Sequence, residues 1–232
     1  MGLFRFKYFD IEQKDSVFKI GTDALVLGSW LEFDRNIKTI LDIGSGTGVL
    51  SLMLAQKSAN ATITALDINP DAVVLAQQNF RRNELGKRCR AIHSNFLQFT
   101  ATSGFDLIVS NPPFFVDAFN SNNPVIDLAK HANTSKIEQF FEKSVALLNE
   151  NGKLALIYPS DSSFLNFARK MGLYPQRNLH VYGKPGVLKR RCSIFGFEKI
   201  EELEENLIIR DDLGNYTDAY RLLTKDYHGV KI

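Results

Sequence analysis

The sequence predicts an α/β fold: a seven-stranded, mostly parallel sheet with helices on both faces and a short N-terminal extension. Apolar segments of strand length, such as residues 39–43 and 106–110, alternate with helical segments from residue 38 onward. This alternation is typical of parallel sheets whose connecting helices cover both faces. We therefore expect an extension over residues 1–37, made of a strand and a short helix, packed on a core domain over residues 38–232.

Each element of this fold has a local signal. Apolar and charged residues alternate over residues 4–9 and indicate a strand, and the segment 22–31 indicates a short helix. Asn69 and Pro70 indicate a helix start, with the asparagine as N-cap and the proline at the first helical position. The core strands are expected at residues 39–43, 62–67, 90–93, 106–110, 153–158, 179–182 and 192–198, and the core helices at 49–57, 70–83, 136–148, 162–171 and 217–226. The glutamate-rich residues 201–206 are expected to form a link.

The composition is that of a globular protein and argues against several classes of function. The formal net charge of +2 over 232 residues does not by itself identify a nucleic-acid-binding protein, so a basic surface would have to come from local clustering. Cys89 and Cys192 lie far apart and outside any C-x-x-C pair, so we expect neither a disulfide nor a metal site. No segment resembles a signal peptide or a membrane span, and we expect a cytoplasmic monomer.

A glycine-rich loop over residues 42–48 joins the first core strand to its helix. Its glycines permit positive φ angles and a close approach of a ligand to the backbone. A dinucleotide site has the spacing G-x-G-x-x-G and holds a pyrophosphate, whereas this loop has G-x-G-x-G after a carboxylate that repels phosphate and attracts an ammonium group. The loop therefore fits S-adenosylmethionine better than NAD. The residues expected at this cofactor are Asp42, Gly44, Ser45, Gly46 and Gly48.

Three further positions belong to the expected cofactor site. Asp67 lies 19 residues after Gly48 at the end of the next strand, where a carboxylate suits the two hydroxyls of a ribose. Ile68 follows it directly. Asn95 follows the third core strand, where its side-chain oxygen would accept a hydrogen bond from the adenine amine or where it would simply form a turn. A glycine-rich loop alone is a weak signal, but the loop and Asp67 in this order indicate a cofactor site.

The four residues Asn111, Pro112, Pro113 and Phe114 directly follow a buried strand. The side-chain oxygen of Asn111 and the carbonyl of Pro112 can accept the two N–H groups of an aromatic amine. This arrangement points the nitrogen lone pair at a methyl donor and favours the developing tetrahedral nitrogen. Phe114 can stack on the base, and the prolines hold the loop rigid. The alternative is a proline turn after a core strand. The motif predicts methylation of a base amine, with Asn111 also bordering the cofactor.

The glycine loop together with the Asn-Pro-Pro-Phe motif resembles the Rossmann-like class I methyltransferases that act on amines of adenine, guanine and protein glutamine. Residues 18–30, and residues 207–210 with 215–220, resemble the bacterial tRNA1(Val) adenine-N6 methyltransferases. The resemblance spans nearly the whole chain. It implies a class I methyltransferase fold, S-adenosylmethionine as cofactor, and methylation of the adenosine at position 37, next to the anticodon, in valine tRNA.

The chain departs from the pattern of that family at three places: Phe114 replaces a frequent tyrosine, Asn95 replaces the more usual aspartate, and a basic stretch after the motif is reduced to Lys130 and His131. A base in a folded anticodon loop must be flipped into the pocket, so contacts to the RNA backbone are expected as well. The residues expected to make them are Lys14, Lys19, Lys130, His131, Lys189, Arg190 and Arg191. For each lysine, a solvated surface position is the competing interpretation.

The sequence is also compatible with other functions. An amine methyltransferase acting on rRNA guanine, DNA adenine or protein glutamine would use the same motif, although residues 18–30 and 207–220 favour the tRNA enzyme. A cofactor-binding RNA chaperone would bind RNA without turnover, and the presence of both Asn111 and Asp67 argues against it. A nicotinamide-dependent dehydrogenase agrees least with the loop spacing.

Overall fold

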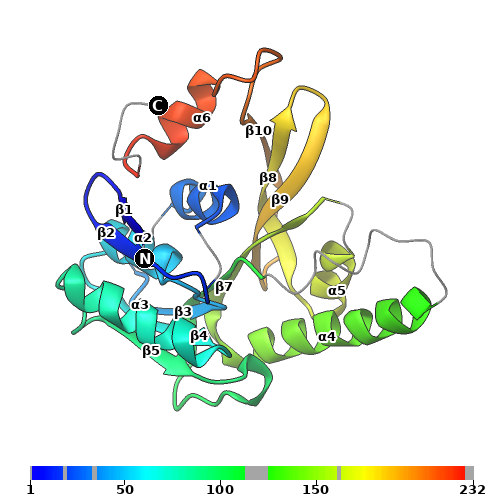
Figure 1. The fold of residues 1–232 in the computed structure, drawn as a ribbon. Helices are drawn as coiled ribbons and strands as arrows, with labels where there is room; N and C mark the ends of the chain where they lie inside the picture. The colour runs from blue at the N-terminus through cyan, green and yellow to red at the C-terminus, as the bar shows by residue number, and fades with distance from the viewer. Residues whose placement is uncertain (1, 18–19, 33–35, 113–124, 161–162, 228–232) are drawn as a thin grey trace.

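A computed structural model describes residues 2–17, 20–32, 36–112, 125–160 and 163–227, with the backbone alone over residues 125–134. Its centre is an eight-stranded sheet with the strand order β10-β8-β9-β7-β6-β3-β4-β5 (Figure 1). Neighbouring strands from β7 to β5 are parallel, and β9 runs antiparallel to both of its neighbours. The strands are β3 (Thr39–Ile43), β4 (Thr62–Asp67), β5 (Cys89–His93), β6 (Phe105–Ser110), β7 (Leu148–Pro159), β8 (Tyr174–Lys184), β9 (Val187–Gly196) and β10 (Leu203–Ile208).

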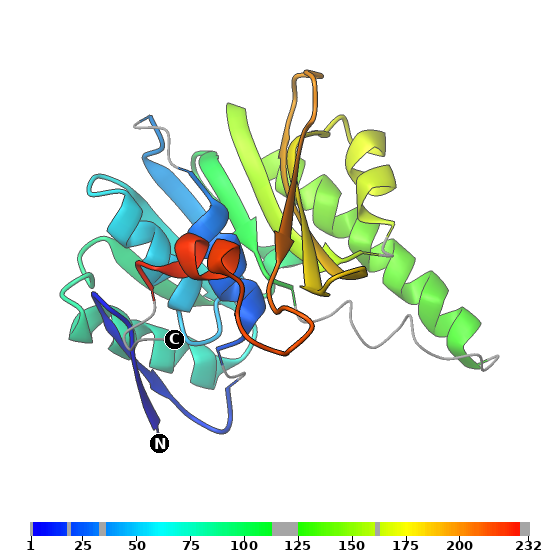
Figure 2. The ribbon, with the colours of Figure 1, turned by 90° about the horizontal axis from the view of Figure 1, so that it is seen from above.

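Helices cover both faces of the sheet, as the alternating pattern predicts (Figures 1 and 2). Successive residues of a strand point to opposite faces, so Ile40 and Val109 join one buried cluster, whereas Leu41 and Ile108 join a second. The first cluster contains residues of α1 (Thr22–Trp30), α2 (Val49–Lys57), α3 (Pro70–Arg82) and α6 (Asp218–Thr224). The second contains residues of α4 (Val125–Leu147), α5 (Phe164–Lys170) and the short 3-10 helix η1 (Phe96–Gln98). Asn69 caps α3 as expected, since its side chain accepts a hydrogen bond from the N–H of Asp71 at 2.9 Å.

The expected number of seven strands is wrong, because the glutamate-rich segment forms β10 at the edge of the sheet, parallel to β8. Glutamate has a low strand propensity, but here its carboxylates find cross-strand partners. Glu205 accepts hydrogen bonds from Arg177 Nε at 2.6 Å and from Trp30 Nε1 at 2.9 Å. The Nε2 of His180 lies 2.6 Å from Glu204. These pairs form only once β8 and α1 are in place, so local propensity could not predict the strand.

The N-terminal extension contains two short strands, β1 (Gly2–Arg5) and β2 (Asp10–Gln13), in place of the single strand expected over residues 4–9. The alternating segment begins at the end of β1 and continues through the turn, where the N–H of Phe6 bonds the carbonyl of Phe9 and the two rings stack 4.5 Å apart. Both rings belong to the same buried cluster as α1 and the sheet. The division of the chain at residue 37 stays a prediction. Within the described ranges, no helix is long and apolar enough to cross a membrane.

Candidate active site

The loops after β3, β4 and β6 meet at one edge of the sheet, because these strands are parallel neighbours. Ile43 at the end of β3 lies beside Leu66 on one side and Ser110 on the other. Ser110 Oγ donates a hydrogen bond to the carbonyl of Ile43 at 2.8 Å and ties the end of β6 to the start of the glycine loop. Asn111 therefore begins its loop directly beside Gly44, as the order of the motifs along the chain predicts.

All three glycines of the loop have positive φ angles, of 72° at Gly44, 53° at Gly46 and 80° at Gly48. The backbone N–H groups of Gly44 and Ser45 donate to the carbonyl of Leu66 at 2.8 and 2.9 Å, which fastens the loop to β4. A Cβ atom at position 48 would lie 2.7 Å from the ring of Phe80. Both this clash and the positive φ angle therefore exclude a side chain at this position. A side chain at Gly46 would meet no atom within 4 Å, because this part of the loop faces open space.

Asp67 connects the end of β4 to the loop and to the start of α3. Its Oδ2 accepts a hydrogen bond from the N–H of Gly46 at 2.8 Å, and its Oδ1 accepts one from the N–H of Asn69 at 2.9 Å. The carboxylate is half-buried, and each oxygen retains a lone pair for a further donor. Ile68, the next residue, is 52% exposed and offers an apolar surface at the same edge.

Asp42 is buried beneath the loop rather than presented at its surface. Its Oδ2 accepts hydrogen bonds from the backbone N–H and the Oγ of Ser51, at 3.1 and 2.6 Å, in the first turn of α2. Burial raises the pKa of Asp42 to about 6, although the hydrogen bonds from Ser51 oppose this shift, and the nearby charge of Asp67 raises it further. The carboxylate therefore braces the junction between loop and helix, and its direct contact with an ammonium group stays a prediction.

Asn95 forms the turn that was one of its two expected roles. Its side-chain oxygen accepts a hydrogen bond from the N–H of Leu97 at 3.0 Å and caps η1. This bond uses one lone pair of the oxygen that was expected to accept the adenine amine, while a second lone pair and the amide nitrogen remain. The contact of Asn95 with a cofactor stays a prediction.

Asn111 and Pro112 are both half-buried at the end of β6. No hydrogen bond joins the side chain of Asn111 to the part of the chain that the structure describes, so its amide is available to a ligand at this edge. Pro113 and Phe114 lie outside the described residues.

Comparisons with known proteins decide the family. The model of the "Methyltransferase small domain" family matches residues 16–171, beginning inside the N-terminal extension. The chain is 37% identical to the tRNA1(Val) (adenine(37)-N6)-methyltransferase of Flavobacterium johnsoniae, over 97% of this chain and 99% of the relative. The proteins of the same name from Bacteroides fragilis and Haemophilus influenzae are each 34% identical, over at least 97% of both chains. The chain belongs to this methyltransferase family, and the resemblance seen in the sequence is confirmed.

Solved structures agree on the fold. A predicted O-methyltransferase from Agrobacterium tumefaciens covers 90% of this chain and 98% of its own with a TM-score of 0.66 at 15% identity. A methyltransferase from Pyrococcus furiosus covers 82% of this chain and 90% of its own with a TM-score of 0.60 at 21% identity. The Rossmann-like class I methyltransferase fold is therefore confirmed, apart from the strand count.

S-adenosylmethionine is the expected methyl donor, and three features of the loop region fit it. The Oγ of Ser45 is buried, and no group in the described part of the chain hydrogen-bonds it, so it can serve a polar ligand group. Gly46 faces open space beside the Asp67 carboxylate, which suits a ribose, and the exposed Ile68 suits the face of an adenine.

Among the residues predicted to contact RNA, the structure describes the side chains of Lys14, Lys189, Arg190 and Arg191, and of these Lys189 and Arg190 line one cleft. In the β8–β9 ladder Val181 pairs with Arg190, but Tyr182 pairs with Leu188, so Lys189 is an extra residue in β9. This bulge lets Lys189 and Arg190 line the same cleft. Arg190 is already paired with Asp23, Nε to Oδ2 at 2.8 Å.

Arg191 lies away from that cleft, opposite Tyr158 and His180 in the two ladders. Of the other predicted RNA contacts, Lys14 donates to Gln78 at 3.4 Å on the outer side of α3. Lys19 lies outside the described residues, as do the side chains of Lys130 and His131 in α4.

The sequence analysis assigned no role to Arg210, which lies at the same edge of the sheet. Its guanidinium stacks 4.0 Å from the ring centre of Tyr216. Together with Lys189, it lines two adjoining clefts of about 290 and 320 Å³ between the β8–β9 hairpin and residues 209–217. We call these the hairpin clefts. The available signal for Arg210 was a basic residue shortly after an apolar segment, two residues beyond the end of β10.

Asp42 makes stability depend on pH in a predictable direction. Its folded-state pKa of about 6 lies above the ordinary 3.8, so its contribution to stability is full below pH 3.8 and is lost as pH rises through about 6. An asparagine at position 42 does not titrate, so Asp42→Asn removes this loss. Between pH 4 and pH 7 the variant's free energy of unfolding should rise relative to that of the unaltered protein by on the order of 2–3 kcal/mol. Urea unfolding of both proteins at several pH values measures the difference, and a difference that does not change with pH would contradict the raised pKa.

Proposed function

We propose that this protein transfers a methyl group from S-adenosylmethionine to N6 of the adenosine at position 37 of valine tRNA. The observation that carries the proposal is the position of Asn111 and Pro112, which follow β6 directly beside the glycine loop. The substrate follows from the names of full-length relatives at 34–37% identity. Such chemistry needs no metal, and we propose a monomeric enzyme that acts in the cytoplasm.

We assign the substrate amine to Asn111 and Pro112. The Asn111 side-chain oxygen and the Pro112 carbonyl accept the two N–H groups, so that the nitrogen lone pair points toward the loop over β3. The bound cofactor supplies an electrophilic methyl group. An aromatic amine is a weak nucleophile because its lone pair is delocalised, and acceptors that favour a tetrahedral nitrogen lower the barrier. Pro113 stiffens this loop and Phe114 stacks on the flipped adenine in the proposed site.

We assign the cofactor to the loop and its neighbours. Asp67 accepts hydrogen bonds from the ribose hydroxyls through the lone pairs left by Gly46 and Asn69. Ser45, with the backbone of Gly44 and Gly46, holds the amino acid group, and Asp42 favours its positive charge from below. Ile68 packs on the adenine and Asn95 contacts its edge.

We propose that the hairpin clefts hold the backbone of the anticodon arm. The exposed Lys189 and the guanidinium of Arg210 supply the positive charge, whereas the charge of Arg190 is largely used by Asp23. The clefts lie at the same edge as Asn111, since Arg190 pairs with Pro159 at the end of β7. Among the predicted cluster of three cations, Lys189 is therefore the proposed phosphate contact.

Replacing both Lys189 and Arg210 with alanine is expected to raise the KM for tRNA and to lower the slope of log affinity against log salt by about one for each phosphate that the variant no longer neutralises. The affinity for S-adenosylhomocysteine should not change. Filter binding of tRNA at several salt concentrations measures the slope. Lys199→Ala is a control for the loss of one exposed positive charge, because Lys199 is exposed beyond the opposite end of β9. If Lys199→Ala lowered the salt slope and the tRNA affinity as much as the double variant, the RNA backbone would not bind in the hairpin clefts.

The function itself is tested by methyl transfer from labelled S-adenosylmethionine to unmodified total tRNA, followed by nucleoside analysis. N6-methyladenosine confined to valine tRNA is the expected product. Label in rRNA, DNA or protein glutamine, with none in tRNA, would reassign the substrate to another amine. Binding of RNA and cofactor without transfer to any of them would favour a chaperone.

A further inference from the structure

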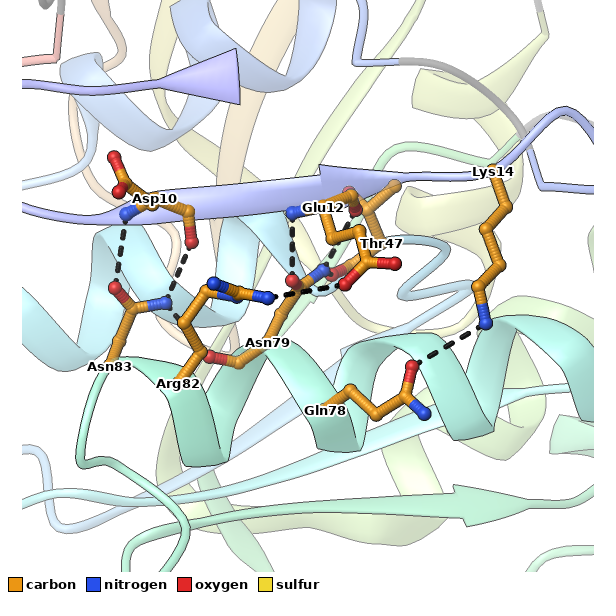
Figure 3. Close-up of polar contacts among 8 residues, drawn as sticks. All are labelled: Asp10, Glu12, Lys14, Thr47, Gln78, Asn79, Arg82 and Asn83. Atoms are coloured by element: carbon orange, nitrogen blue, oxygen red, sulfur yellow. Dashed lines mark hydrogen bonds and ion pairs between the residues drawn. The ribbon is translucent and has the colours of Figure 1, made fainter. Parts of the chain in front are cut away.

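One side chain contacts both the N-terminal strand β2 and the glycine loop (Figure 3). Asn79 is fully buried in α3, between these two segments. Its Oδ1 accepts a hydrogen bond from the N–H of Glu12 at 2.8 Å, and its Nδ2 donates to the carbonyl of Glu12 at 3.1 Å. The same Nδ2 donates to the carbonyl of Thr47, inside the loop, at 2.9 Å. Every donor of this amide is therefore used, and it joins two segments far apart in the sequence.

Asn83, one turn later at the C-cap of α3, makes the equivalent contacts to β2 but none to the loop. Its Oδ1 accepts from the N–H of Asp10 at 3.0 Å, and its Nδ2 donates to the carbonyl of Asp10 at 2.8 Å. Its other hydrogen bond returns to the carbonyl of Asn79, within α3. Figure 3 shows the two amides side by side along β2, where they bond the strand's backbone as a neighbouring strand would. Asn79 and Asn83 thus differ in the contact to Thr47.

The glycine loop is held from two directions. On the side of the cofactor, Asp67 accepts the N–H of Gly46, and on the side of α3, Asn79 binds the carbonyl of Thr47. The side chain of Thr47 is itself buried, and Gly48 lies against Phe80 of the same helix. Two consecutive residues of the loop are therefore fixed from opposite sides: Asp67 holds Gly46, and Asn79 of α3 holds Thr47.

We propose that Asn79 is a positioning residue for the cofactor, and that through it the docking of β2 on α3 sets the geometry of the glycine loop. Without Asn79, the buried carbonyl of Thr47 has no partner, and the loop relaxes to find another. The coupling is reciprocal, so cofactor binding also holds β2 against α3. The inference rests on the cofactor part of the proposed function and is independent of the tRNA substrate.

The test compares Asn79→Ala with Asn83→Ala by calorimetric titration with S-adenosylhomocysteine. Both changes leave an N–H and a carbonyl of β2 without a partner, so both should lower Tm, and Asn79→Ala should lower it more because the buried carbonyl of Thr47 also loses its donor. Asn79→Ala should also weaken binding by about tenfold, the equivalent of one buried hydrogen bond, whereas Asn83→Ala should not. The kcat of Asn79→Ala at saturating cofactor should remain near that of the unaltered protein. Equal affinities in the two variants would make Asn79 a purely structural residue.

Hydrogen exchange on the unaltered protein gives a second test that needs no variant to fold. S-adenosylhomocysteine is expected to slow exchange of the Glu12 N–H, which bonds Asn79. The N–H of Ile209, which bonds the carbonyl of Tyr182 away from the loop, is the internal control. Unchanged exchange at Glu12 with the ligand bound would overturn the proposal. A failure to methylate tRNA would alter neither result.

Discussion

Asn111→Ala is expected to lower the turnover of methyl transfer by roughly 10²–10³-fold, the usual cost of removing one group aimed at a developing charge. The affinity for S-adenosylhomocysteine should fall by only a few-fold, because the loop and Asp67 retain all their contacts. The reason is positional: Asn111 follows Ser110, whose hydroxyl anchors the strand end to Ile43, so the change removes the acceptor without moving its backbone. Single-turnover kinetics with saturating tRNA measure the loss.

Asn206→Ala is the matched control for Asn111, since Asn206 is an exposed asparagine on the edge strand β10. It should leave turnover and cofactor affinity unchanged. If Asn111→Ala loses cofactor affinity and turnover in equal proportion, then Asn111 serves the cofactor and not the substrate amine. A normal turnover would remove the Asn-Pro-Pro-Phe motif from the chemistry altogether.

Asp67→Ala is expected to have the opposite profile. The affinity for S-adenosylhomocysteine should fall by roughly 10–100-fold, since a hydrogen bond to a charged group contributes about 1.5–3 kcal/mol. The decrease has two sources: the ribose hydroxyls lose their acceptor, and the N–H of Gly46 loses the carboxylate that holds the loop. At saturating cofactor, turnover should largely recover, because the substrate acceptors on β6 are untouched. Calorimetry and kinetics at rising cofactor concentration separate the two effects.

The control for Asp67 is Asp71→Ala, which removes an exposed carboxylate from the first turn of the same helix. Asp67→Asn is informative as well, because it keeps one acceptor oxygen and should recover part of the affinity. A Kd that stays within twofold in Asp67→Ala would contradict the assignment of the ribose to this carboxylate.

The sequence could predict the loops of the site because each signal is local. Three short segments carry these signals: alternating glycines, an acid at a strand end and an Asn-Pro-Pro sequence. Each restricts the backbone within a few residues, and parallel strands bring the loops that follow them to one edge of the sheet. Gly48 illustrates this: its φ of 80° is one that few other residues adopt readily. The cap formed by Asn69 and Pro70 was likewise predictable from adjacent residues.

Only the tertiary structure decided which polar side chains act across segments. β10 forms because Arg177 and His180 of β8 meet the carboxylates of Glu205 and Glu204. The bulge that brings Lys189 and Arg190 to one cleft depends on ladder register.

Asn79 looks like any polar residue of an amphipathic helix until β2 and the glycine loop close on it. By itself, the sequence determined the order of elements and the loops of the site, because backbone conformation is set by near neighbours. The partners of buried amides and exposed charges were decided by contacts between distant segments, which exist only in the folded chain.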